Sequence, residues 1–99
     1  MAEHAAVINV SRYRPTAGKR QELVAAMRQI AEQAVAAKGC FGAQVCESDL
    51  DPEELVGISR WESAQALKAF SDAAASTSQR ERFRGLVTGA AKRENLSPI

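Results

Sequence analysis

The chain has 99 residues, 13 of them basic and 12 acidic, so its formal net charge is +1. This length predicts a single domain over residues 1–99, and the charge balance gives no electrostatic footprint for binding nucleic acid. No apolar run approaches the roughly 20 residues of a membrane span. The N-terminal segment carries an acid where a secretory signal carries positive charge, so we expect a cytoplasmic protein with residues 1–4 and 98–99 flexible.

The first predicted element is a strand over residues 5–14, which Pro15 ends. Its side chains alternate between a mostly polar face and an apolar face. The polar face carries Asn9, Ser11 and Tyr13, and the other carries Ile8 and Val10.

A long amphipathic helix is predicted over Lys19 to Lys38, because Leu23 and Met27 begin an apolar stripe at helical spacing. Gly39 follows as a left-handed C-terminal cap, with Lys38 favourably placed against the helix dipole.

A second strand is predicted over residues 41–48, followed by a turn over residues 48–52. Cys40 and Cys46 lie six positions apart in this extended stretch, which separates them by about 20 Å. That distance is too long for a disulfide, and free thiols fit the cytoplasm.

The third strand, residues 54–61, leads straight into a helix over residues 64–70 that Ser63 is expected to cap. Trp61 stands at the junction, where a small domain would place a recognition or catalytic aromatic.

The second helix is predicted to restart at Ser78, because Ser78 to Glu81 matches a capping box, and to turn Phe83 and Leu86 or Val87 inward. An edge strand over residues 90–96 completes the chain.

The resulting order is βαββαβ, which predicts an α+β, ferredoxin-like domain with a four-stranded antiparallel sheet and both helices on one face. Apolar residues occur on both faces of the sheet, so we expect a homodimer whose open sheet faces pack together. The alternative is an exposed, half-polar face carrying Arg12, Gln44 and Arg60.

Three motifs, in this order and spacing, resemble the antibiotic biosynthesis monooxygenase family. They are the stretch from Trp61 to Leu67, the start of the second strand at residues 39–42, and the terminal residues 92–98. The resemblance implies a dimeric α+β barrel. The family includes cofactor-independent oxygenases of polycyclic phenols or quinols, heme-degrading enzymes and proteins of unknown role.

In the oxygenases of this family, a tryptophan at the position of Trp61 lines the pocket. An asparagine four residues earlier binds the substrate oxygen, and that position is Gly57 here. A tyrosine six residues after the tryptophan corresponds to Leu67. Many quinol-oxygenase-like members carry a histidine where Phe70 stands.

In the heme-degrading branch, an asparagine on the first strand matches Asn9, and the aromatic that presses on the porphyrin corresponds to Phe70. The axial histidine falls near Gln79, and the only histidine of this chain is His4. The resemblance therefore gives no histidine donor for heme.

By strand parity, Asn9, Ser11 and Tyr13 share one side of the first strand, and Gly57, Ser59 and Trp61 share one side of the third. If both sides face the helices, these residues converge into one pocket. We predict catalytic roles for Trp61 and Asn9, with no cofactor and no metal. The substrate-binding residues predicted are Tyr13, Ser11, Gly57, Ser59, Leu67 and Phe70.

Each of these residues also has a purely structural interpretation. Trp61 and Phe70 would then be core, Asn9 would bond to neighbouring backbone, and Tyr13 would be surface. The three arginines Arg80, Arg82 and Arg84 would form a solvated helix face, unless one of them clamps an anionic substrate.

The leading hypothesis is a cofactor-independent monooxygenase that oxidises a planar phenolic, quinol or polyketide-like substrate with O₂. The alternative is a catalytically inactive dimeric protein of the same fold that binds a small aromatic ligand. A heme-degrading enzyme is a third hypothesis, disfavoured by the absence of a suitable histidine.

Overall fold

The protein is described by a computed structural model covering residues 4–74 and 77–99. Its elements are β1 (Val7–Pro15), α1 (Arg20–Ala36), β2 (Cys40–Glu47), β3 (Leu55–Trp61), α2 (Ala64–Ala74), α3 (Thr77–Leu86) and β4 (Val87–Leu96). The strands form an antiparallel sheet in the order β2-β3-β1-β4, with β1 paired to both β3 and β4. This is the ferredoxin-like order, so the predicted α+β fold is confirmed.

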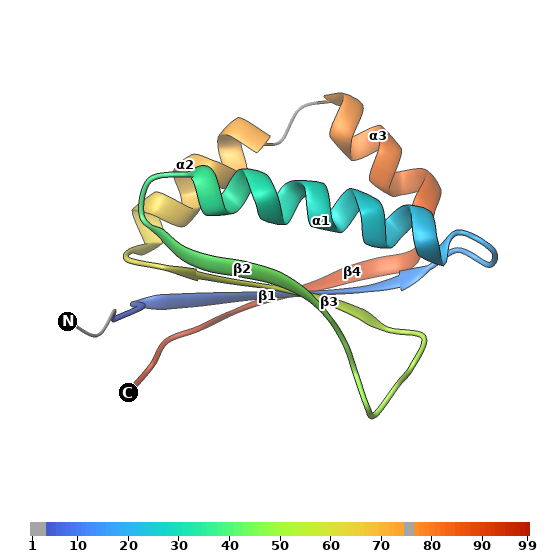
Figure 1. Ribbon diagram of the computed structural model, residues 1–99, viewed down its shortest axis with the longest axis horizontal. Coiled ribbons are helices and arrows are strands. Elements are labelled where there is room, and N and C mark those ends of the chain that lie inside the picture. The colour runs from blue at the N-terminus through green and yellow to red at the C-terminus, as the bar shows by residue number, and fades with distance from the viewer. Residues whose placement is uncertain (1–3, 75–76) are drawn as a thin grey trace.

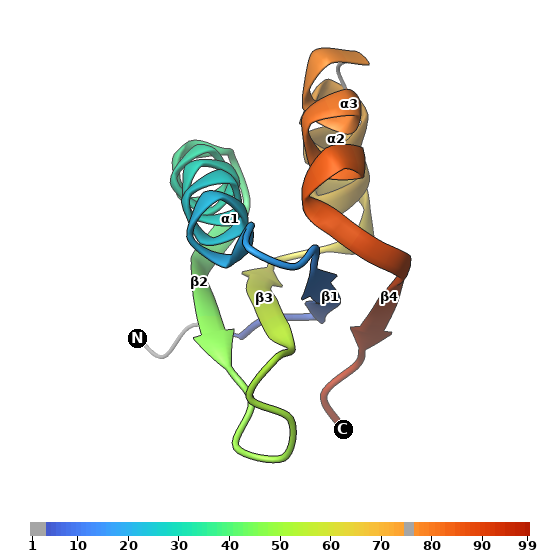
Figure 2. The ribbon, with the colours of Figure 1, turned by 90° about the vertical axis from the view of Figure 1, so that its right-hand side faces the viewer.

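The helices form one layer above the sheet (Figure 1). Seen along the strands, α1 lies above the β2 side of the sheet and α2 and α3 lie above the β4 side (Figure 2). Two apolar clusters join helices to strands, one at each end of the sheet. The first contains Leu23, Ala26, Met27, Leu55 and Leu86, and the second contains Val7, Ala34 and Trp61.

The register of β1 against β3 fixes which side chains face the helices. Asn9 pairs with Ser59, and Ser11 pairs with Gly57. Val7 lies opposite Trp61, and both belong to a cluster that includes a helix residue. The predicted strand parity is therefore confirmed, and a polar row lies between two apolar ends on the helix side of the sheet.

The opposite face of the sheet has no helix over it in the described part of the chain (Figures 1 and 2). Strand parity places Ile8, Val10, Val56 and Ile58 there. Val10 and Val56 are already buried by their neighbours, whereas Ile8 and Ile58 are only half-buried.

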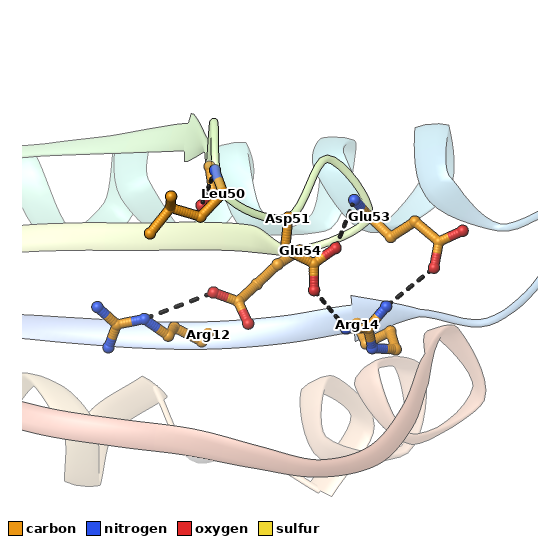
Figure 3. A network of polar contacts seen from close by, with 7 residues as sticks. Arg12, Arg14, Leu50, Asp51, Glu53 and Glu54 are labelled. Atoms are coloured by element: carbon orange, nitrogen blue, oxygen red, sulfur yellow. Dashed lines mark hydrogen bonds and ion pairs between the residues drawn. The ribbon is translucent and has the colours of Figure 1, made fainter.

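The loop between β2 and β3 extends below the sheet, away from the helices (Figure 1). Ion pairs tie it to β1: Arg14 contacts Asp51, and its Nη1 lies 2.9 Å from Glu53 Oε2 (Figure 3). Leu50 is 92% exposed on this loop. Such exposed ion pairs contribute little stability, but they hold the loop on the helix-free side.

The predicted end of the first helix was wrong by two residues. The Ala37 N–H donates to Ala34 O at 2.9 Å and Ala37 itself is extended, so α1 ends at Ala36 and has no basic residue in its last turn. Gly39 does adopt a left-handed conformation, with φ +86°. It therefore turns the chain into β2 and does not cap the helix as predicted.

The predicted cap of the second helix is confirmed, because Ser63 Oγ accepts a hydrogen bond from the Ala66 N–H at 3.1 Å. The predicted capping box at Ser78 was wrong in position, since α3 begins at Thr77 and Ser78 lies inside it. The side chains of residues 74–80 lie outside the described part of the structure.

Further along, Leu86 is buried and Phe83 packs on the same cluster, as predicted. β4 is an edge strand, but it begins at Val87, three residues earlier than predicted. Cys40 and Cys46 both lie in β2 and are free thiols, as predicted. None of the helices in the described ranges is both long and apolar enough to cross a membrane.

Candidate functional site

A cavity of about 380 Å³ lies between α1 and the α2–α3 pair, with the sheet as its floor. Its size is typical of small-molecule sites, and its wall is a mixture of polar floor and apolar sides. The floor includes Asn9, Ser11, Tyr13, Ala43, Val45, Gly57, Ser59 and Arg93, and the helices contribute Met27, Ile30, Ala31, Ala34, Leu67, Phe70, Ser71, Asp72 and Phe83.

The polar floor is a connected row of side chains. The Asn9 Nδ2 donates to Asn95 Oδ1 at 2.8 Å across the β1–β4 ladder, and Ser11 Oγ lies 3.4 Å from Asn9 Oδ1. These contacts hold the Asn9 amide in one orientation, because its two ends have different partners. The bond to Asn95 leaves one amide hydrogen of Asn9 available to a ligand.

Trp61 lies behind the cavity wall and is not part of it. Its side chain is fully buried, and its indole Nε1–H donates to Ser59 Oγ at 2.8 Å. Its ring also packs against Phe70, with centroids 5.3 Å apart. Since Ser59 accepts from the indole, its own hydroxyl hydrogen is free to donate into the cavity. Trp61 therefore contacts two residues that line the cavity, Ser59 and Phe70, without lining it itself.

The apolar sides of the cavity come from the facing surfaces of α1 and α2. Leu67 and Phe70 of α2 line the cavity, as do Met27 and Ile30 of α1. Gly57 adds room in the floor, because a Cβ built there would meet only the terminal methyl of Met27, at 3.5 Å. The space between the walls therefore suits a largely apolar small molecule.

Two charged residues border the cavity, and neither was predicted from the sequence. Asp72 is engaged by Lys68 at 2.8 Å, and this hydrogen bond, with the charge of Asp72, raises the pKa of Lys68 above its ordinary value. Arg93 Nη2 lies 3.5 Å from the Tyr13 hydroxyl. The Tyr13 ring is itself held against Phe83, with centroids 5.4 Å apart.

Of the three arginines considered as clamps, Arg82 and Arg84 do not line the cavity. Arg82 Nη1 donates to Gln29 Oε1 at 2.8 Å, which ties α3 to α1, and Arg84 is exposed away from the lining. The Arg80 side chain lies outside the described residues. Arg93 could have been predicted to line the cavity only from the register of β4 against β1. Its pairing with Ser11 places its side chain on the helix side of the sheet, where that of Ser11 also lies.

Within residues 4–74 and 77–99, no group of three or more side chains is suited to hold a metal ion. His4 is exposed just before β1, and Cys40 packs beside Trp61 with its Sγ 3.5 Å from Gly42 O. Neither lines the cavity, so the described wall offers no imidazole or thiolate ligand for a heme iron.

A family model described as antibiotic biosynthesis monooxygenase matches residues 6–84. The structure is similar to that of Rv0793 from Mycobacterium tuberculosis, at 26% identity and a TM-score of 0.83, covering 94% of each chain. No curated protein sequence matches the chain.

Two further structures show the same fold and carry a provisional description as antibiotic biosynthesis monooxygenases. The protein from Nitrosomonas europaea is 14% identical with a TM-score of 0.83, covering 100% of this chain and 96% of its own. The protein from Deinococcus radiodurans is 19% identical with a TM-score of 0.81, covering 93% of this chain and 91% of its own.

Proposed function

Because the chain belongs to the antibiotic biosynthesis monooxygenase family, we propose that it is a cofactor-independent monooxygenase of a planar phenolic, quinol or polyketide-like substrate. The observation that carries the proposal is the cavity, in which a hydrogen-bonding floor lies between apolar helix walls. A flat polycyclic ring would fill the space between α1 and α2, and its oxygen substituents would face Asn9, Ser11 and Ser59.

The chemistry requires a substrate that reduces O₂ itself once a proton has been removed. For an anthrone, the reacting CH₂ becomes a carbonyl: one oxygen atom joins the carbon, and the other leaves as water with its two hydrogens. The substrate supplies all the electrons. The protein binds the ring, excludes water and stabilises the oxyanion.

Two floor groups would serve that oxyanion. Ser59, whose hydroxyl is oriented by Trp61, donates one hydrogen bond, and the free amide hydrogen of Asn9 donates another. Donors held in place before the reaction stabilise developing charge without further reorganisation. The catalytic role of Trp61 is therefore to position Ser59, and that of Asn9 is direct.

Oxygen uptake with a panel of quinols and anthrones tests the proposal. The wild type should turn over at least one of them, and Asn9→Ala should lower kcat by about tenfold to a hundredfold, as expected for loss of one oxyanion donor. Asn95→Ala removes the partner that orients Asn9 but keeps the Asn9 amide in the lining, so it should lower kcat by less than Asn9→Ala. No uptake by the wild type with any substrate would reject the enzyme.

A binding or accessory protein of the same fold is the second candidate. It is favoured by Gly57, Leu67 and Phe70, which are apolar where catalytic members of the family carry polar groups. Saturable quenching of the single tryptophan by planar aromatics, without oxygen uptake, would select this function. Heme degradation is tested by titration with hemin. A Soret shift, followed by bleaching when a reductant is added, would support that hypothesis.

We also propose that two copies pack through the helix-free sheet face. The support is that this face carries an apolar row, including the half-buried Ile8 and Ile58, and that the chain places all its described helices on the other side. Sedimentation at micromolar concentration should give twice the 10.6 kDa chain mass. A particle of single-chain mass would reject the dimer.

A further inference from the structure

Arg93 is the one positive charge on the described cavity wall. Strand pairing with Ser11 puts it on the helix side of β4, and its Nη2 approaches the Tyr13 hydroxyl at 3.5 Å. No carboxylate in the described ranges pairs with it, whereas Arg12, Arg14 and Arg20 all have acidic partners. Its guanidinium therefore keeps hydrogen-bonding capacity for a ligand.

The other charge at the cavity is already compensated. Asp72, on the cavity rim, is paired with Lys68 at 2.8 Å. Arg93 is therefore the charged residue of the described wall that has no partner of opposite charge. An anionic group there would gain a charge-assisted hydrogen bond.

Resting on the proposed function, we infer that the ligand is a planar aromatic that carries a carboxylate, which Arg93 binds together with Tyr13. A carboxylate has two oxygens and can accept from the guanidinium and the phenol at once. Packing against Phe83 holds the Tyr13 ring, so its hydroxyl is positioned before the ligand arrives. With the carboxylate at this end, the rings extend over Ser11 toward Ser59, along the polar floor.

Calorimetric titration with naphthalene-2-carboxylate and its neutral carboxamide tests this inference without any reaction. The wild type should bind the carboxylate roughly tenfold more tightly than the carboxamide, as expected for a charge-assisted hydrogen bond at a partly exposed site. Arg93→Gln should reduce this ratio to about one, Arg93→Lys should keep part of it, and Tyr13→Phe should lower it by roughly threefold.

Lys92→Gln is the matched control. Lys92 is the adjacent residue on the same strand, but it pairs with Arg12 and lies on the opposite face, so its removal deletes the same charge outside the cavity. The ratio should stay at the wild-type value. Equal binding of the two ligands by the wild type, an unchanged ratio in Arg93→Gln, or an equal loss in Lys92→Gln would each overturn the inference.

Thermal unfolding of Arg93→Gln should match the wild type, because the side chain is exposed, and this separates lost binding from lost folding. Carboxylate preference that depends on Arg93 without oxygen uptake by any quinol would reject the oxygenase and keep the inference. Turnover of a quinol by the wild type, together with equal binding of the carboxylate and the carboxamide, would keep the oxygenase and reject the inference.

Discussion

The indole N–H of Trp61 donates to Ser59 Oγ at 2.8 Å, and this bond links the most deeply buried side chain of β3 to the cavity floor. The two residues are two positions apart on one strand, so they share a face and stand at successive sites along it. Trp61 is thereby both a core residue and a support of the candidate site, which joins the two interpretations of it that the sequence allowed.

Trp61→Phe should lower the free energy of unfolding by about 2 kcal/mol, through loss of packed ring atoms and of one hydrogen bond. Ser59→Ala should cost about 1 to 3 kcal/mol, because the indole donor is then buried without a partner. Urea unfolding followed by far-UV circular dichroism, at one protein concentration, measures both. If the hydrogen bond couples Trp61 and Ser59, the double variant will lose less free energy of unfolding than the two single variants lose together. Strictly additive losses would contradict the coupling.

Gly39→Ala should be markedly destabilising. The residue has φ +86°, and an added Cβ would lie 2.7 Å from Ala66 Cβ, where α2 packs on the start of β2. The left-handed backbone costs about 1–2 kcal/mol and the overlap about 1–3 kcal/mol more.

Gly18→Ala is the control for Gly39→Ala, because Gly18 has φ +78° with nothing within 4 Å of an added Cβ. Only the backbone cost should appear there. Urea midpoints that fall equally for the two variants would show that the contact with Ala66 is relaxed at no cost.

Gly57→Asn should raise the rate of oxygen uptake by at least about tenfold, because it restores a donor at the position where oxygenases of the family carry one. The floor has room for the first atom, since an added Cβ meets only the mobile end of Met27 at 3.5 Å. Gly57→Ala isolates the steric effect and should be neutral or stabilising by about 0.5–1 kcal/mol. A rate in Gly57→Asn no higher than in Gly57→Ala would contradict the role of the amide.

Ile8→Lys should convert the proposed dimer to single chains. Ile8 is half-buried on the helix-free face, where it lies opposite Leu96. A charge buried without a partner at an interface costs several kcal/mol. Val35→Lys is the control, because Val35 is 55% exposed on α1. Sedimentation of both variants decides the matter, and a dimer that survives Ile8→Lys would place the interface elsewhere.

The strands and the polar floor could be predicted because alternation has a period of two and the register follows from it. Asn9, Ser11 and Ser59 were found in this way without any knowledge of the helices. The end of α1 was missed because Gly39 has the conformation of a cap, whereas Ala37 and Ala34 close the helix earlier by a local bond. No local pattern reveals such competition.

Arg93 was missed for a different reason. Its side-chain direction depends on how β4 pairs with β1, which involves a shift of register between Arg12 and Arg14. Strand parity within residues 90–96 alone leaves two choices of face. The sequence left the depth of Trp61 open, because a strand-end aromatic that faces the helices can either border a cavity or lie beneath its wall.

The hydrogen bond between Asn9 and Asn95 joins positions 86 residues apart. Contacts of such long range form late, since the loop-closure entropy must be overcome first. The cavity floor is therefore complete only when β4 pairs with β1. Until then, the edge of β1 that faces away from β3 has no partner strand and is open to other chains. Ligand that binds across both strands would favour this final step, so folding yield and ligand supply should rise together.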